Sequence, residues 1–308
     1  MTSPAPLPDA EPTNGVDRFA PPRLRPWLRL GRFDRPVGIW LLMLPGWQGI
    51  ALAAAMQHRL PDLRLLGLVF LGAALMRAAG CAYNDIIDRD IDAKVARTAM
   101  RPIPAGQISV KQAWAFVAAC CTAALLILIS LPPLAIGLGI GSLALVAGYP
   151  FMKRITWWPQ AWLGLTFNWG ALLGFAAASG ELTLAAGLLY ASGVFWTLGY
   201  DTIYAIQDLE DDALAGVKSS ARRLGNAAPR AVASFYLVAL ALALGASVVA
   251  GLGLGFSLVF IAFAIHLGLQ ARRVKIDDGA LALRLFKSNG WAGLILFGAL
   301  VAGSWPLA

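Results

Sequence analysis

The sequence has little charge for its length. Asp, Glu, Lys and Arg make up 14% of the 308 residues, against roughly 25% in an average soluble domain. Hydrophobic residues make up 58%, and the mean hydropathy is +0.67. This composition excludes an ordinary water-soluble domain and predicts a protein that crosses a membrane several times.

Cysteine and histidine are scarce as well, with three Cys and two His residues. The cysteines fall inside apolar stretches without metal-ligand spacing, so we interpret them as packing residues. The N-terminal region has no apolar core of the kind that signal peptides carry. We expect residues 1–26, which are Pro-rich and polar, to form a disordered tail before one transmembrane domain over residues 27–308.

Long apolar stretches are what the chain has in abundance. A helix of about 20 residues crosses a bilayer, and nine stretches approach or reach that length. They cover residues 37–56, 64–83, 112–131, 134–150, 160–178, 184–206, 231–250, 254–270 and 289–306. The sequence therefore predicts an all-α membrane protein with nine transmembrane helices.

The basic residues predict the orientation of these helices. If the N-terminus is cytoplasmic, only Arg59 and Arg64 fall in outside connections and Arg77 lies within a span, while all other Lys and Arg lie inside. The positive-inside rule demands such an asymmetry. We therefore expect a multi-pass protein of a bacterial inner (cytoplasmic) membrane. Its net charge of +8 then reflects topology and contact with anionic membrane lipids, with no nucleic-acid partner.

Two acidic clusters lie at the expected cytoplasmic ends of spans, NDIIDRDID at 84–92 and DLEDD at 208–212. Carboxylates near hydrocarbon are costly and usually mark an ion or substrate site. The alternative is a solvated loop that balances nearby basic residues, and it stays open for Asp90, Glu210 and Asp211. Hard oxygen ligands followed by basic residues suit Mg²⁺ ions that bridge a diphosphate. We expect this site to face the cytoplasm.

The spacing within the clusters fits helices. Asn84, Asp88 and Asp92 are four residues apart, which places them along one helical face. Asp208 and Asp212 repeat this spacing, and Asp201 lies almost two turns earlier on the same predicted face. The two clusters also resemble each other, which suggests two half-sites across a central cavity.

Three basic residues outside the clusters are further candidates. Lys153 and Arg154 end the YPFMKR segment, where they serve either as positive-inside anchors or as ligands for diphosphate oxygens. Arg77 aligns with Asn84 and Asp88 but lies deeper, within a span. It either pairs with the acidic face or holds an anionic group of the substrate.

Together these segments resemble the UbiA superfamily of intramembrane aromatic prenyltransferases. The resemblance runs from about Arg32 to Trp291, and the segments at 149–160 and 199–221 are similar to the branch that acts on 4-hydroxybenzoate. The segments that carry it are RFDRPVGIWLLMLP (32–45), MRAAGCAYNDIIDRDID (76–92), RTAMRPIPAG (97–106), YPFMKRITWWPQ (149–160) and GYDTIYAIQDLEDDALAGVKSSA (199–221).

The resemblance implies a ring of nine helices around a central cavity and a reaction of ubiquinone biosynthesis. A polyprenyl diphosphate would donate its prenyl group to the carbon ortho to the hydroxyl of 4-hydroxybenzoate, with Mg²⁺ as cofactor. The implied site residues are, for metal, Asn84, Asp88, Asp92, Asp208 and Asp212; for catalysis, Asp201, Lys153 and Arg154; and for substrate, Arg77, Arg101, Tyr149, Tyr204 and Lys218.

Other functions explain less of the sequence. A transporter predicts charges near the bilayer midplane and an inverted repeat, whereas these acids gather at one membrane face. A CDP-alcohol phosphotransferase would carry a denser Asp-Gly and Ala-Arg signature around residues 84–110. Within the superfamily, an enzyme that acts on homogentisate or a naphthoate is the main alternative.

Overall fold

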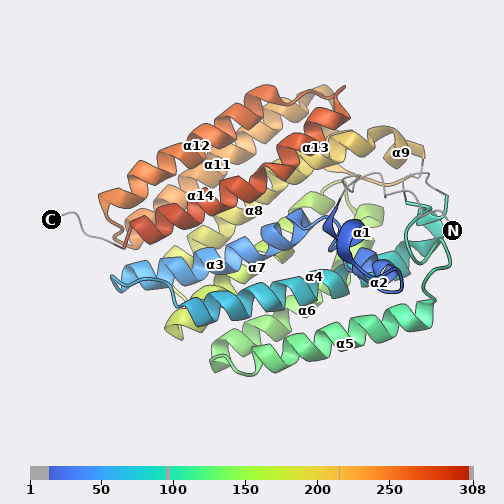
Figure 1. Ribbon diagram of the computed structural model, residues 1–308. Helices are drawn as coiled ribbons and strands as arrows, with labels where there is room; N and C mark the ends of the chain where they lie inside the picture. The colour runs from blue at the N-terminus through green and yellow to red at the C-terminus, as the bar shows by residue number, and fades with distance from the viewer. Residues whose placement is uncertain (1–13, 95–97, 215, 305–308) are drawn as a thin grey trace. The chain divides into compact units, whose positions relative to one another are not determined.

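The computed structural model describes residues 14–94, 98–214 and 216–304. Within these ranges the chain is helical and forms no β-strand (Figure 1), which confirms the predicted all-α class. The chain divides into two compact units. Unit 1 takes in the described part of Met1–Trp40 with Leu71–Ile127, and unit 2 takes in Leu41–Phe70 with the described part of Leu128–Ala308.

Unit 1 is built mainly on two long helices, α4 (Leu63–Asp92) and α5 (Val110–Leu128). Its N-terminal part adds α1 (Gly15–Phe19), α2 (Arg25–Leu30) and the first residues of α3 (Val37–Met56). Ala78 and Ala79 of α4 pack against Cys120 of α5 in one apolar cluster. A second cluster joins Leu30 to α4 and to the segment that precedes α5. Cys120 therefore packs in the core, as predicted.

The described part of the expected tail, residues 14–26, contains α1 and the start of α2. The Asn14 side chain accepts a hydrogen bond from the backbone N–H of Asp17 and caps α1. Arg29 of α2 donates to the Asp17 carboxylate at 2.7 Å. Burial raises the pKa of Asp17, but hydrogen bonds from Asn14 and Arg29 outweigh this and hold it below its usual value. Residues 1–13 lie outside the described residues, and one domain over residues 27–308 stays a prediction.

Unit 2 contains the rest of α3, the first turns of α4 and the remaining helices. They are α6 (Pro133–Ile155), α7 (Pro159–Ser179), α8 (Leu184–Ala205), η1 (Ile206–Asp208), α9 (Leu209–Leu214), α10 (Ser220–Leu224), η2 (Gly225–Ala227), α11 (Ala228–Val249), α12 (Leu254–Arg273), α13 (Gly279–Lys287) and α14 (Asn289–Ala302). Helix α8 packs against α7 and α11, and α12 packs against α14.

Close backbone packing joins α3 to α7 within unit 2. A Cβ atom on Gly49 would overlap the backbone oxygen of Ala171. Only glycine allows the two backbones to approach this closely, and small residues at helix contacts are characteristic of membrane proteins.

Eight helical segments of the described chain are long and apolar enough to cross a membrane. They match eight of the nine predicted stretches. The one remaining predicted stretch, 184–206, forms α8. This helix has 22 residues but is not among the eight segments that qualify as membrane spans. Asp201 and several hydroxyl-bearing residues make α8 less apolar. Of these, Ser192, Thr197, Tyr200 and Thr202 are buried in unit 2, and Asp201 is half-buried.

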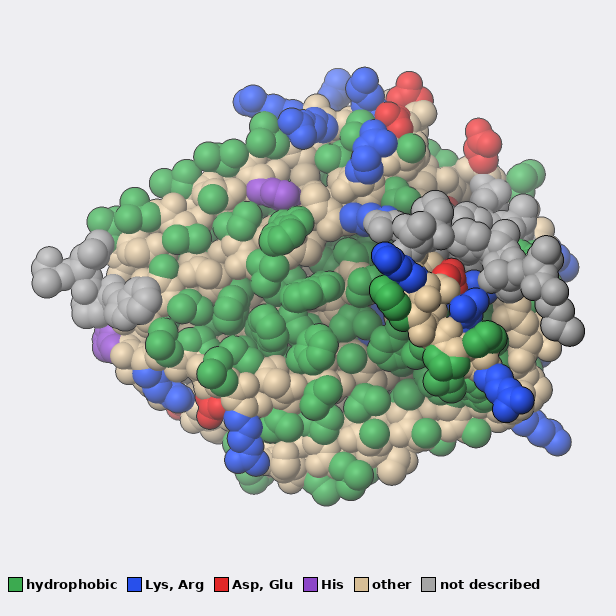
Figure 2. Space-filling view, viewed as in Figure 1, with side chains coloured by type: hydrophobic (Ala, Val, Ile, Leu, Met, Phe, Trp, Pro, Cys, Tyr) green, Lys and Arg blue, Asp and Glu red, His purple; other side chains and the backbone are tan. Residues whose placement is uncertain are grey.

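Many large hydrophobic side chains are exposed, and green hydrophobic surface covers much of the face in Figure 2. Examples are Leu126 with 64%, Val248 with 73% and Leu258 with 61% of the residue exposed. Such surface is unfavourable in water and suits contact with lipid chains. The structure thus supports the predicted membrane environment.

Candidate active site

The first acidic motif lies at the C-terminal end of α4 in unit 1. The helix continues past Gly80 without another Gly or Pro and ends at Asp92. There the hydroxyl of Thr98 donates a 2.8 Å hydrogen bond to the Asp92 carbonyl oxygen. Asp88 and Asp92 are buried and Asn84 is half-buried. Because α4 is continuous, the spacing of four places these three residues on one face.

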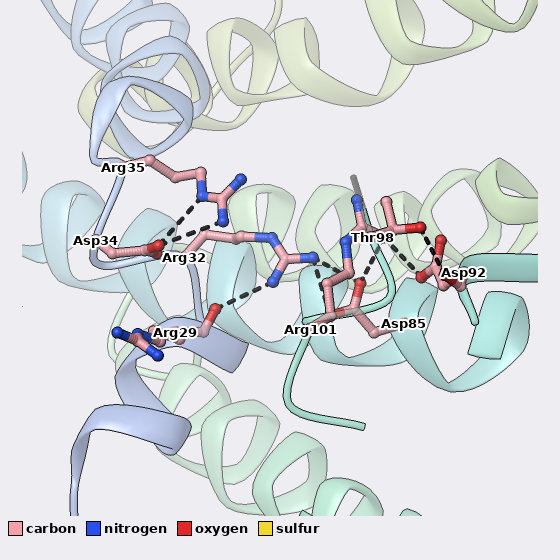
Figure 3. A network of polar contacts seen from close by, with 8 residues as sticks. All are labelled: Arg29, Arg32, Asp34, Arg35, Asp85, Asp92, Thr98 and Arg101. Atoms are coloured by element: carbon pink, nitrogen blue, oxygen red, sulfur yellow. Dashed lines mark hydrogen bonds and ion pairs between the residues drawn. The ribbon is translucent and has the colours of Figure 1, made fainter. Parts of the chain in front are cut away.

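Two arginines hold the acidic end of α4 (Figure 3). Arg32 Nη2 donates to both carboxylate oxygens of Asp85, at 2.6 and 2.9 Å. Arg101 Nη1 donates to Asp85 Oδ1 at 3.2 Å and to Asp92 Oδ2 at 2.7 Å. Arg101, a predicted substrate ligand, therefore lies against Asp92, a predicted metal ligand.

The charged side chains of this network are almost completely buried. Asp85 has 0% and Arg32 7% of its surface exposed. Charges buried to this extent are tolerated only with partners and hydrogen bonds. Burial lowers the pKa of Arg32, but the Asp85 carboxylate outweighs this effect and holds the pKa above its ordinary value. Arg32 is therefore charged throughout the physiological range.

Neither Arg32 nor Asp85 was among the predicted site residues. Asp85 lies outside the spacing of four, and Arg32 precedes it by 53 positions, so helical periodicity does not connect them. The signal that was present is the position of Asp85, three residues before Asp88 on a helix that faces protein. A carboxylate in that position requires a cation from another segment.

Arg77 lies on the same helix, seven residues before Asn84. Its guanidinium packs against the first turn of α3, where a Cβ on Gly38 would lie 2.7 Å from both Nε and Nη2. The missing side chain of Gly38 thus provides the space that Arg77 occupies. Its predicted contact with the substrate stays a prediction.

The second acidic motif, in unit 2, differs from the first in local structure. Helix α8 ends at Ala205, and the 3₁₀ segment η1 precedes α9. The segment from Asp201 to Asp208 is therefore not one continuous α-helix, because its last turn has the tighter 3₁₀ winding. That the two residues share one face stays a prediction. Helix α13 packs on η1, with Gly279 directly against Gln207. Asp208 and Asp212 are half-buried.

The segment after the second motif is hydrogen-bonded to the C-terminal end of α6. The backbone N–H of Lys218 donates to the Lys153 carbonyl at 2.9 Å, and its ammonium group donates to the Ile155 carbonyl at 3.1 Å. Two predicted ligands, Lys153 and Lys218, are thereby brought together. Arg154 is exposed on the last turn of α6.

Arg222, which was not a candidate, fixes the same segment. Its guanidinium donates to the Asp212 carbonyl at 3.1 Å and to the Val217 carbonyl. It also lies over the Trp157 ring, 5.5 Å from the centroid. The position of Arg222, two residues after Lys218–Ser219–Ser220, gives no sequence signal for this contact, which depends on how the segment folds back.

The remaining candidates lie on long helices of unit 2. The Tyr204 ring, at the end of α8, lies 4.4 Å from the Phe286 ring of α13. Asp201 is half-buried on α8, and Tyr149 is half-buried on α6 just before Pro150. Their roles stay predictions.

No three His, Cys, Asp or Glu side chains among residues 14–94, 98–214 and 216–304 form a ready metal cage. Mg²⁺ commonly takes one or two carboxylates and completes its shell with phosphate oxygens and water. Asp88 and Asp92 on one face of α4, and Asp208 with Asp212, supply donors of this kind. The residues therefore fit Mg²⁺ that binds together with a diphosphate.

Comparison with known proteins gives consistent matches. The model of the UbiA prenyltransferase family matches residues 42–304. A mitochondrial 4-hydroxybenzoate polyprenyltransferase of Rattus norvegicus is 48% identical, covering 94% of this chain and 77% of that protein. The Caenorhabditis elegans protein of the same name is 43% identical, covering 92% and 80%.

Solved structures agree on the fold. A UbiA homologue from Aeropyrum pernix superposes with a TM-score of 0.71 and 29% identity, covering 85% of this chain and 96% of that one. A UbiA homologue from Archaeoglobus fulgidus, bound to GPP and Mg²⁺, has a TM-score of 0.66 and 21% identity, covering 90% and 99%.

The names of these relatives correct the expected location. Both are named mitochondrial, so the prediction of a bacterial inner membrane, with a site facing the bacterial cytoplasm, is wrong. The positive-inside rule identifies the membrane side that keeps the basic loops. The rule carries no information about the organelle, so the basic residues could not distinguish a bacterial from a mitochondrial membrane.

Proposed function

The chain belongs to the UbiA prenyltransferase family, and we propose that it prenylates 4-hydroxybenzoate in ubiquinone biosynthesis. A polyprenyl diphosphate donates the prenyl group to the ring carbon ortho to the hydroxyl, and diphosphate is released. The observation that carries the proposal is the 48% identity, over 94% of this chain, to a protein named for this activity.

The acidic motifs supply the metal ligands in this proposal. Asn84, Asp88 and Asp92 hold one Mg²⁺, and Asp208 with Asp212 holds a second. Bound Mg²⁺ acts as a Lewis acid that stabilises charge on the departing diphosphate. The support is the donor chemistry of the motifs and the Mg²⁺ in a family structure of the same fold.

Basic residues add hydrogen bonds to the diphosphate. Lys153, Arg154 and Lys218 are proposed for this role, because cations aimed at developing negative charge stabilise the transition state. The hydrogen bond from Lys218 to the Lys153 carbonyl supports a joint role for these two lysines.

Arg77, Asp201 and the two tyrosines serve the organic parts of the substrates. Arg77 binds the carboxylate of 4-hydroxybenzoate in a setting of low dielectric constant, and Asp201 orients or deprotonates the phenol. Tyr149 and Tyr204 line the substrate site. An apolar surrounding protects the allylic cation from water until the ring attacks it.

A product assay tests the activity. Membranes that contain the protein are incubated with polyprenyl diphosphates and, in parallel, with 4-hydroxybenzoate, homogentisate and a dihydroxynaphthoate, and products are resolved by mass. We expect prenylated 4-hydroxybenzoate, loss of activity with EDTA and recovery with excess Mg²⁺. Product from homogentisate or the naphthoate alone would favour another branch of the family, and full activity in excess chelator would contradict the metal proposal.

A further inference from the structure

Arg101 shares one nitrogen between two carboxylates of α4. Its Nη1 lies 2.7 Å from Asp92 Oδ2 and 3.2 Å from Asp85 Oδ1 (Figure 3). The two acids differ in the role that the proposed function gives them, since Asp92 is a metal ligand and Asp85 is not. The Arg101 guanidinium therefore links the proposed metal ligand Asp92 to Asp85, which has no proposed role in metal binding.

Asp85 is the fixed end of this link. Its side chain is 0% exposed, and Arg32 binds both its oxygens through Nη2. Arg32 is itself anchored, because its Nη1 donates to the Arg29 carbonyl at 3.0 Å. The contacts with Arg32 therefore hold Asp85 in place independently of Asp92.

At Asp92, Arg101 must give way to Mg²⁺ if Asp92 is to bind the metal. A guanidinium 2.7 Å from Asp92 Oδ2 occupies lone pairs that a Mg²⁺ ligand must offer to the metal. The same cation balances the Asp92 charge in a site that is nearly buried. Arg101 and Mg²⁺ therefore compete for Asp92, and the competition concerns charge as well as geometry.

We propose that Arg101 is an exchangeable counter-ion of Asp92 and that Asp85 is the positioning residue that retains it at the site. This inference rests on the proposed function. Without substrate, Arg101 neutralises Asp92. When Mg²⁺ and diphosphate bind, Arg101 leaves Asp92, stays on Asp85 and turns its other donors to diphosphate oxygens. Guanidinium has five N–H donors in a fork, so it can bind Asp85 and phosphate oxygens at once.

The exchange predicts opposite effects of one substitution on two affinities. In Arg101→Gln, purified in detergent, Mg²⁺ alone should bind at least as tightly as in the wild type, because its competitor is gone. Inorganic diphosphate at fixed Mg²⁺ should bind roughly tenfold more weakly or worse, because a charge-assisted donor is lost. Isothermal titration measures both affinities without turnover. A loss of both affinities, as expected of a purely structural arginine, would overturn the proposal, and so would unchanged diphosphate affinity.

A double-mutant cycle tests the part that Asp85 plays. Asp85→Asn should weaken diphosphate binding in the wild-type background and add nothing in the Arg101→Gln background, because both changes remove the same contact. Additive losses would overturn the role of Asp85. Asp90→Asn is the matched control on α4, since Asp90 is exposed and pairs only loosely with Arg89, at 3.7 Å. It should leave both affinities unchanged.

A second substitution serves if Asp85→Asn does not fold because Arg32 loses its partner. Arg101→Lys keeps the charge but lacks the fork of donors. It should restore the wild-type Mg²⁺ affinity and leave diphosphate affinity low, and full recovery of diphosphate affinity would overturn the two-point contact. A wild-type protein without prenyltransferase activity would instead contradict the proposed function, which these titrations do not address.

Discussion

At the scale of single residues, burial separates acids that look equivalent in the sequence. Asp88 has 0% of its surface exposed, whereas the side chain of Asp90 is 81% exposed. Both belong to one run of four aspartates. Helical spacing placed Asp88 on the predicted acidic face, whereas it left open whether Asp90 is a solvent-facing charge. The neighbours that hold Asp85 are distant in the sequence, and no local pattern could predict them.

The first prediction follows from this difference in burial. Asp88→Ala should abolish turnover while the protein still inserts and folds, because the substitution removes a proposed Mg²⁺ ligand. Asp90→Ala, on the same helix, should retain wild-type turnover. Initial rates of prenyl transfer, together with size-exclusion profiles, check both variants, and equal damage by the two would argue against a selective metal role.

The second prediction concerns Arg77 as the acceptor ligand. Arg77→Leu should raise the KM for 4-hydroxybenzoate tenfold or more, a loss of about 1.4 kcal/mol, with the KM for the prenyl donor much less changed. If Arg77 only neutralises the acidic face of α4, both KM values should change together. Steady-state kinetics on folded protein separate these results.

The third prediction uses the glycine beside Arg77. A Cβ on Gly38 must displace the guanidinium, so Gly38→Ala should also raise the acceptor KM, and by less than Arg77→Leu. Gly80→Ala, on α4, is the control, because a Cβ there meets nothing within 4 Å. That control should leave the KM unchanged and slightly favour the helix. An acceptor KM that Gly38→Ala does not alter would remove the link between this space and the acceptor.

At the scale of helices, the length of each apolar stretch predicted that a helix exists and roughly where it ends. It did not predict where a helix is interrupted. The sequence QDLEDD continues the pattern of α8, yet η1 breaks the helix at Ile206–Asp208. Helix α13 packs on this segment, and it lies far along the chain. The break is therefore a tertiary effect, and the spacing of Asp208 and Asp212 alone could not reveal it.

The fourth prediction concerns the contact of α3 with α7. Gly49→Ala should destabilise the protein by about 1–3 kcal/mol, because the added methyl group overlaps the Ala171 backbone. Gly187→Ala, at an open position of α8, should be neutral or slightly stabilising. Thermal unfolding in detergent compares the two, and equal unfolding temperatures would show that α3 and α7 can separate at no cost.

At the scale of the whole molecule, the number of spans decides where the C-terminus lies. Eight helices qualify by length and composition within the described residues, and α8 would be the ninth span. We predict nine spans, since the distribution of Lys and Arg fits only an odd number with α8 included. The evidence for nine spans is the distribution of basic residues among the connections. The composition of α8 alone does not predict that it crosses the membrane.

The fifth prediction tests that count. In a bacterial expression host, a tag at the N-terminus should be accessible from the cytoplasmic side and a tag at the C-terminus from the opposite side. Protease protection in vesicles of known orientation measures both. Two tags on the same side would mean that α8 does not cross the bilayer.

The contact between Gly49 and Ala171 also has a consequence for synthesis of the chain. The segment that contains Gly49 leaves the ribosome well before its partner on α7 exists. At about 5–20 residues per second, the delay is on the order of ten seconds. During this time Gly49 cannot make its contact with Ala171, so the order of translation sets the earliest time at which α3 and α7 can pack together.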